Sequence, residues 1–427
     1  MTPPKIMLAG AGEKAQYLAH NFNDNTIRFI LHYPANIDAD VLCSATGALV
    51  ASVDILHASF IPGNLGAYWH VNREYSPSDY FTFFQTETET MSAAVAASLK
   101  AIAPDSTVQL HCTLVQGVNE AAIALTISHL CVDGVDGKYL LGKLIEAYNL
   151  LIQNHNTDAL IVKNGNRAAE QVYEELTPKE YFSLIKNPLS GVKTMFPFPS
   201  EDNGILRMIW KNISSDVMTN ARSRAKKENA TANDILLTAF YRAYASLSDV
   251  DETAAMSIMS MMDLRQHCKN GESDGLCNMS GSLPTTLKQG VHGNFSDTLA
   301  EVSEQTRAAK ADPLAGLSGM PLLHGVTHTT PMWLMLQAAE RVYSSLSLGL
   351  TNLGNISCAS LALNGLLPDN GIFGGPLKKK PSMQVSAVSF DGAPTLAIVG
   401  EFTKEDSDAL QGLLNNITTE ITNYAQA

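Results

Sequence analysis

The residues best suited to chemistry are His129 and Asp133, which stand four apart in the stretch HLCVDG (129–134). An imidazole with an ordinary pKa near 6.5 is largely neutral at cellular pH and can accept a proton. Removing a proton from an attacking hydroxyl or amine contributes about 10²–10⁴-fold to a transfer reaction. The sequence therefore predicts His129 as a general base, with a carboxylate close by in the chain.

The elements around this pair should hold it at the end of a buried strand. Ile123, Leu125 and Ile127 alternate with small residues, which is the period-2 pattern of a strand, and His129 continues the same face. The Asp133-Gly134 dipeptide is typical of a turn. An apolar stripe that begins after Gly137 predicts a helix. A strand end of this kind places polar groups on a rigid frame.

His129, Asp133 and Gly134 match the HxxxDG core of the chloramphenicol-acetyltransferase-like superfamily, which the chain therefore resembles. That superfamily includes condensation domains of non-ribosomal peptide synthesis, alcohol acyltransferases and polyketide-associated acyltransferases. The fuller condensation motif has two histidines, of which the second is catalytic, and Ser128 occupies the first position here. Further resemblance follows in order along the chain, at the stretches RSRAKKENATANDILLTAFYRAY (222–244), DLR (263–265), GLCNMSGSLPTTL (275–287) and TNLGNI (351–356).

The resemblance implies an α/β protein, an α+β sandwich of two acetyltransferase-like lobes. Each lobe would be a mixed β-sheet with helices, and the two would form a pseudo-dimer with a channel between them. Residues 1–185 would form the lobe that carries HxxxDG, and residues 186–427 the second lobe. A polar, proline-containing stretch from residue 154 to about 200 favours a boundary there.

The same resemblance implies roles for the other site residues. Asp133 would be structural and bonded to a cation, although a carboxylate there could also serve as a second base. Condensation domains place the supporting arginine where this chain has His57, so Arg265 or His57 is the expected partner of Asp133, next to Gly134 in the motif. The remaining candidates for lining the channel or stabilising an oxyanion are Asn352, Ser280 and Ser128.

The implied reaction moves an acyl group from a thioester to a hydroxyl or amine. The donor would be acyl-CoA or a phosphopantetheinyl carrier protein acting as co-substrate, with no bound cofactor and no metal. Two other functions stay open. One is a stand-alone condensation protein that joins two carrier-bound substrates in an amide. The other is a non-catalytic homologue that binds a partner or lipid, which the departures at Ser128 and His57 would suit.

Composition narrows the possibilities further. A net charge of −13 argues against nucleic-acid binding. Six scattered cysteines without CxxC pairs favour reduced thiols, and no apolar stretch reaches the length of a membrane span. The start of the chain lacks the pattern of a signal peptide, so we expect a cytoplasmic protein.

Several other features have plainer interpretations. The basic run at residues 378–380 reads as a solvated loop, although a phosphate-bearing substrate would also suit it. The glycines at positions 10 and 12 imitate a dinucleotide fingerprint, but no acidic residue ends the following strand. Cys131 is expected to pack rather than to act as a nucleophile. Trp69 and Trp333 are expected in the core.

Overall fold

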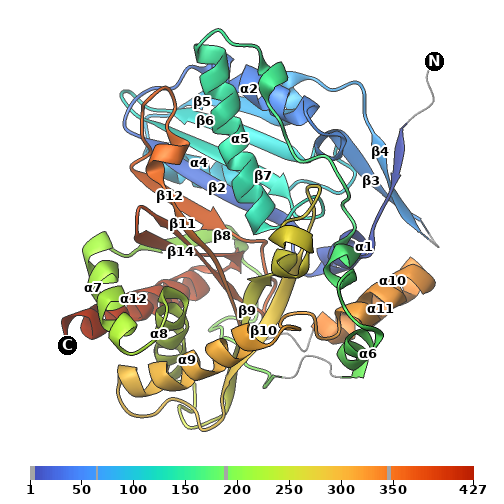
Figure 1. Ribbon diagram of the computed structural model, residues 1–427. Coiled ribbons are helices and arrows are strands. Elements are labelled where there is room, and N and C mark those ends of the chain that lie inside the picture. Colours follow the sequence, from blue (N-terminus) through green and yellow to red (C-terminus); the bar gives the residue numbers. More distant parts are fainter. Residues whose placement is uncertain (1–4, 64–65, 187–190, 344–347) are drawn as a thin grey trace.

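The computed structural model describes residues 5–63, 66–186, 191–343 and 348–427. Two sheets dominate the molecule, each accompanied by helices, and Figure 1 shows them as an upper and a lower lobe. This arrangement confirms the predicted α/β fold of two lobes. Each lobe has a hydrophobic core of its own, and the boundary near residue 185 stays a prediction.

The first sheet has the strand order β12-β2-β7-β6-β5. Its strands are β2 (Thr26–Tyr33), β5 (Phe81–Gln85), β6 (Leu110–Gln116), β7 (Ala121–Ser128) and β12 (Asn370–Gly374). Because successive side chains of a strand point to opposite faces, Phe29 and Leu125 face one core while Ile30 and Ala124 face another. Both faces are therefore covered by helices.

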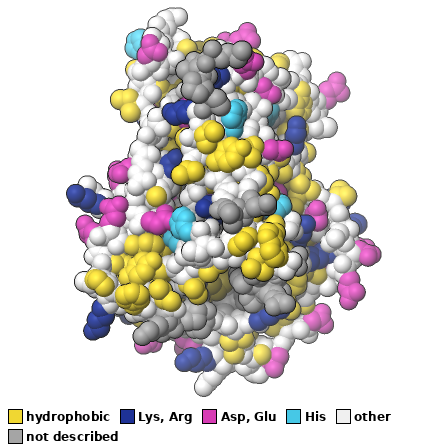
Figure 2. Space-filling view, turned by 90° about the vertical axis from the view of Figure 1, so that its right-hand side faces the viewer, with side chains coloured by type: hydrophobic (Ala, Val, Ile, Leu, Met, Phe, Trp, Pro, Cys, Tyr) yellow, Lys and Arg dark blue, Asp and Glu magenta, His cyan; other side chains and the backbone are white. Residues whose placement is uncertain are grey.

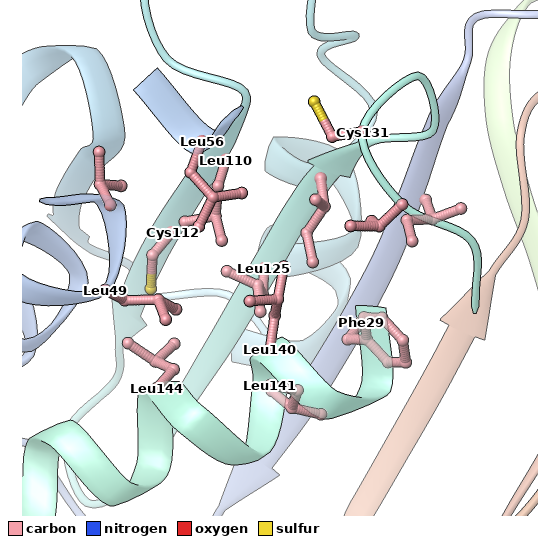
Figure 3. Packing of buried hydrophobic residues seen from close by; sticks show 14 of the residues in the cluster. Phe29, Leu49, Leu56, Leu110, Cys112, Leu125, Cys131, Leu140, Leu141 and Leu144 are labelled. Carbon is pink, nitrogen blue, oxygen red and sulfur yellow. The ribbon is translucent and has the colours of Figure 1, made fainter. Parts of the chain in front are cut away.

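Helix α5 (Gly134–Ile152) packs on the face that carries Phe29 and Leu125. Figure 3 shows its residues Leu140, Leu141 and Leu144 directed at the sheet. These positions recur with the period of a helix, so one apolar stripe is buried along the whole element. On the opposite face lies α4 (Thr90–Ser98), and α2 (Ala39–Ala51) packs beside α5.

The second sheet has the order β10-β9-β11-β13-β14-β8. Its strands are β8 (Ile205–Asn212), β9 (Met256–Asp263), β10 (Ser280–Leu287), β11 (Leu348–Ile356), β13 (Gln384–Phe390) and β14 (Ala393–Phe402). The helices that contribute to its core are α7 (Ser215–Lys227), α8 (Ala232–Ala245), α9 (Phe295–Ala311) and α12 (Lys404–Gln426).

One strand from the second half of the chain joins the first sheet. Strand β12 pairs antiparallel with β2, with Ile372 opposite Ile30, and it also contacts β13 and β14. In Figure 1 this strand, from the red end of the colour scale, lies beside the blue β2. The lobes are thus joined by shared strand pairing, and a cavity at their junction can receive side chains from both halves.

The N-terminal glycines belong to a separate small sheet. Strands β1 (Ile6–Leu8), β4 (Ala67–Val71) and β3 (Ala58–Pro62) pair antiparallel, and α1 (Ala11–Leu18) follows β1. A dinucleotide site needs a parallel sheet and a free helix N-terminus. Here the Gly10 amide already donates to Glu13 Oε2 at 2.6 Å. The alternative of a dinucleotide fold is therefore wrong.

One local prediction needs correction. Helix α5 begins at Gly134 rather than after Gly137, because the Asp133 side chain accepts hydrogen bonds from two amides of its first turn. A 3₁₀ turn (Asp54–His57) precedes β3. The remaining helices are α3 (Pro77–Tyr80), α6 (Pro178–Lys186), α10 (Met320–Thr329) and α11 (Met332–Tyr343).

The tryptophan predictions divide. Trp69 is buried as expected, but Trp333 on α11 is 57% exposed, so its assignment to the core is wrong. Figure 2 shows clusters of hydrophobic side chains on the face of the molecule turned to the viewer. Exposed apolar residues of the elements on that side include Leu8, Leu322, Leu323 and Trp333.

Within the described ranges, no helix has the length and apolar content that crossing a membrane requires.

Candidate active site

A cavity of about 260 Å³ lies where the two sheets meet. Its walls come from both lobes, and His129 projects into it from the end of β7. The other lining residues that matter below are Gln16, Asp133, Gly134, Asp263, Ser280, Asn352, Lys378 and Gln384. The predicted base therefore lines a cavity at the junction of the two lobes.

Backbone and side-chain contacts fix His129 in place. Its amide donates to the Asn25 carbonyl at 2.6 Å, and its carbonyl accepts from Asn278 Nδ2 at 3.1 Å. The same Asn278 nitrogen lies 2.9 Å from His129 Nδ1. Asn278 Oδ1 accepts from the Ser280 amide at 3.3 Å, so the bonds to Ser280 and to the His129 carbonyl fix the orientation of this amide.

The surroundings keep the imidazole neutral. Burial lowers the pKa of His129 below its usual value, the Lys378 charge lowers it further, and Asp133 opposes both effects. His129 is only partly buried and lines the cavity, so its ring reaches accessible space, while backbone hydrogen bonds of His129 and Val132 also oppose the lowering of its pKa. A neutral ring with an accessible nitrogen is what a general base requires.

Asp133 caps α5 and is fully engaged. Its Oδ1 accepts from the amides of Val135 and Asp136, each at 3.0 Å. Its Oδ2 accepts from Arg265 Nη1 at 2.7 Å and from the Met279 amide at 2.8 Å. Because all of these donors compete for the lone pairs, the carboxylate suits a supporting role better than that of a second base.

Arg265 connects the two halves of the site. Besides Asp133, its guanidinium donates to Asp136 Oδ2 at 2.8 Å, to Asp263 Oδ1 at 3.0 Å and to the Cys277 carbonyl at 3.1 Å. Burial raises the pKa of the Asp136 carboxyl, Asp133 adds to this, and Arg265 opposes it. A buried cation shared by several carboxylates thus ties the start of α5 to β9 and to the segment before β10.

Two predicted residues lie elsewhere. His57 does not contact Asp133, because its Nδ1 bonds the Asn72 carbonyl at 2.7 Å and its Nε2 lies 4.0 Å from Asp54. Of the two expected partners, only Arg265 pairs with Asp133. Ser128 is fully buried and does not line the cavity, since it precedes His129 on β7 and its side chain takes the opposite face. Its assignment to the channel wall is therefore wrong.

Gly134, Ser280 and Asn352 do line the cavity. A Cβ on Gly134 would stand 2.6 Å from Leu353 Cδ2, so glycine leaves room for the Leu353 side chain of β11. Asn352 Nδ2 donates to Asn233 Oδ1 at 3.3 Å, which leaves its second proton available. Ser280 Oγ has no hydrogen-bond partner in the described part of the chain. Both are neutral donors near the base.

Sequence reasoning missed Asn278, Asp136 and Lys378. Asn278 stands two residues before Ser280, on the segment that resembles a channel strand, and this spacing was a usable signal. Asp136 lies three residues after Asp133, in the first turn of α5. Its ion pair with Arg265 joins residues far apart in the sequence, so no local signal marks it. Lys378 was read as part of a solvated basic run, and only the fold shows that it enters the cavity.

The remaining nucleophilic and metal-binding possibilities find little support. Burial raises the pKa of the Cys131 thiol to about 12, which suits packing rather than attack. His328 pairs with Glu170 at 3.0 Å, and His324 contacts the Tyr173 hydroxyl at 3.2 Å. Among the residues that the structure describes, no cluster of three or more acidic, cysteine or histidine side chains is arranged to hold a metal ion.

Several solved structures share this fold over nearly the whole chain. Polyketide synthase associated protein 5 from Mycobacterium tuberculosis is 14% identical, with 99% of this chain and 100% of that one covered and a TM-score of 0.65. The first condensation domain of the CDA synthetase is 12% identical, with 99% of this chain and 97% of that one covered and a TM-score of 0.70. Trichothecene 15-O-acetyltransferase from Fusarium sporotrichioides is 11% identical, with 98% of this chain and 95% of that one covered and a TM-score of 0.70. At these identities the likeness concerns the fold.

The sequence itself supplies the family. No curated protein matches the chain, but the family model for the condensation domain matches residues 15–319, which is most of its length. The resemblance first drawn from HxxxDG is thereby confirmed. The chain belongs to the condensation-domain family.

Proposed function

We propose that this protein is an acyltransferase that moves an acyl group from a thioester to a hydroxyl or amine, with His129 as the general base. The donor is acyl-CoA or an acyl carrier protein. The observation that carries the proposal is the neutral, accessible imidazole of His129 in a cavity built from both lobes. Family membership makes transferase chemistry the natural use of that imidazole.

The reaction needs no covalent enzyme intermediate. His129 Nε2 accepts the proton of the acceptor O–H or N–H while that atom attacks the thioester carbonyl. The tetrahedral intermediate then collapses, the C–S bond breaks, and the imidazolium returns the proton to the departing sulfur. The products are an ester or amide and a free thiol. For Nε2 to begin as the acceptor, Nδ1 must hold the ring proton, and the backbone carbonyl of His129 lies within reach as its acceptor.

Positioning supplies much of the expected rate. Binding both substrates in one cavity converts a two-molecule encounter into an effectively unimolecular step. The developing oxyanion needs donors within about 2.7–3.1 Å of its position. We assign this task to Ser280 Oγ and to the unused proton of Asn352 Nδ2, which line the same cavity. Asp133 and Arg265 keep the two walls together.

The direct test measures free-thiol release from a panel of short and medium acyl-CoAs, with small alcohols and amines as acceptors. We expect turnover with the native protein and a loss of about 10²–10⁴-fold in His129→Gln. His111→Gln is the matched control, because His111 is also half-buried but lines a different cavity. Equal activity of the native protein and His129→Gln would refute the proposed base.

The same assay separates the other functions. Turnover that appears only with acyl-loaded carrier proteins would identify a stand-alone condensation protein that forms an amide. Absence of thiol release with both kinds of donor would leave a non-catalytic binding homologue.

A further inference from the structure

The three lysines at positions 378–380 have three different environments. Lys379 is exposed. Lys380 Nζ is held by Asp406 and by the carbonyls of Ser200 and Asp202. Lys378 lines the cavity that contains His129. The interpretation of this run as a solvated loop is therefore correct for Lys379 alone.

The backbone fixes Lys378 on the cavity wall. Its amide donates to the Val399 carbonyl of β14 at 3.3 Å, and the amide of Leu377 donates to Asp24 Oδ1 at 2.9 Å. These contacts hold the segment after β12 between the two lobes. The Lys378 side chain therefore lies at the junction of the two lobes.

The ammonium group has no counter-ion in the described part of the chain. Asp24 is the carboxylate whose charge acts on it most, but Asp24 already pairs with the fully buried Arg28. The carboxylates of the cavity wall, Asp133 and Asp263, both bond Arg265. Each nearby anion is thus engaged by another cation, and Lys378 forms no ion pair.

An enclosed cation without a partner is unfavourable. Burial lowers the pKa of Lys378 to about 8, a value at which the amine is still mostly protonated at neutral pH. An arriving anion would restore the lost interaction. Nearby, Gln16 and Gln384 line the same cavity with no side-chain hydrogen bonds among the described residues, so neutral donors for a second oxygen are also at hand.

We propose that Lys378 is a specificity-determining residue that binds a carboxylate carried by one of the substrates. The inference rests on the proposed acyltransferase function and narrows its substrates to carboxylate-bearing molecules. That carboxylate belongs either to the acyl group, as in a dicarboxylic half-thioester, or to the acceptor, as in a hydroxy acid. In both cases the ammonium holds it at the end of the cavity while His129 works on the reacting atoms.

The first experiment requires no turnover. Amine-selective acetylation followed by peptide mass spectrometry gives the labelling rates of Lys378 and, as an internal control, of exposed Lys379. Succinate and 3-hydroxybutyrate should protect Lys378 saturably, while succinamide and methyl 3-hydroxybutyrate should not. Lys379 should be labelled equally throughout. Equal labelling of Lys378 with and without the carboxylates would overturn the inference, whatever the protein catalyses.

The second experiment assigns the carboxylate to one substrate. Succinyl-CoA is compared with butyryl-CoA as donor, and 3-hydroxybutyrate with its methyl ester as acceptor. We expect kcat/KM to favour the charged member of one pair by about 10- to 100-fold, as a charge-assisted hydrogen bond in an enclosed site provides. Lys378→Met should abolish that preference and Lys379→Met should retain it.

The outcomes are distinguishable from those of the proposed function. Thiol release without any preference for charge would leave the acyltransferase proposal intact and overturn the role of Lys378. Protection of Lys378 without thiol release from any donor would support the carboxylate site and contradict the acyltransferase proposal.

Discussion

Replacing Asp133 with alanine should destabilise the protein as much as it impairs turnover. The change removes the N-cap of α5, which typically costs about 1 kcal/mol. It also breaks a buried ion pair, which typically costs about 3–5 kcal/mol. Because Arg265 keeps Asp136 and Asp263 as partners, the lower end of that range applies. The expected loss is about 4 kcal/mol, a large part of a usual stability of about 5–15 kcal/mol.

Asp38→Ala is the matched control for this change. Asp38 caps α2 through two comparable amide bonds, at 3.0 and 3.1 Å, but it is exposed and forms no ion pair in the described chain. It should lose only about 1 kcal/mol. Urea unfolding midpoints and soluble yield measure both variants, and turnover is corrected for the folded fraction.

The result that would refute the structural role is specific. Asp133→Ala with the same unfolding midpoint as Asp38→Ala would show that the buried pair contributes nothing measurable. A fully folded Asp133→Ala protein that has lost only activity would instead indicate that Asp133 takes part in the reaction, for example as a second base. Adding Arg265→Met to Asp133→Ala should cost further stability, since it also removes the guanidinium that pairs with the buried Asp136.

Three further predictions concern other residues of the site. Asn278→Asp would place a carboxylate near His129 Nδ1 and raise the pKa of His129, so the acidic limb of the kcat/KM profile should move up by roughly 1–2 units; an unmoved limb would contradict the contact. Lys378→Met should stabilise the protein at neutral pH by at most about 3 kcal/mol. A lysine pKa depressed from 10.5 to about 8 costs stability fully below pH 8, so this advantage should fade as pH rises towards 10.5 in urea unfolding. Gly134→Ala should lower the melting temperature slightly, at the lower end of the about 1–3 kcal/mol of overpacking, because only the flexible end of the Leu353 side chain must shift, and Leu353→Val should relieve it; a more stable Gly134→Ala would show that helix propensity outweighs the clash.

Much of the fold was predictable because its signals are local. The alternation of residues 121–128 and the apolar stripe of α5 correspond to the observed β7 and α5. The start of α5 was misplaced because Gly134 and Gly137 weaken helix propensity there, while the decisive cap is made by the Asp133 side chain. Trp333 was misassigned because hydrophobicity predicts average burial and cannot identify which face of a helix lacks a covering partner.

The site was only half predictable, for a physical reason. His129 and Gly134 are marked by a motif with fixed spacing, whereas Asn278 lies 149 residues from His129 in the sequence and Lys378 follows β12, in the second half of the chain. For Lys378 the neighbouring residues give no sign that its side chain enters the cavity. Charge illustrates the difficulty best, since three adjacent lysines differ only in which carboxylates the fold brings near them.

Arg265 and Lys378 together show how the second half of the chain completes a site whose base comes from the first. Arg265 forms ion pairs with Asp133, Asp136 and Asp263 and holds α5 against β9 and the segment before β10. Its charge therefore stabilises the fold. Lys378 reaches the same cavity with its charge uncommitted. Since keeping a cation enclosed and unpaired lowers stability, its retention is best explained by a ligand that supplies the missing anion. The stability gained by Lys378→Met and the carboxylate preference lost with it should therefore appear in the same variant.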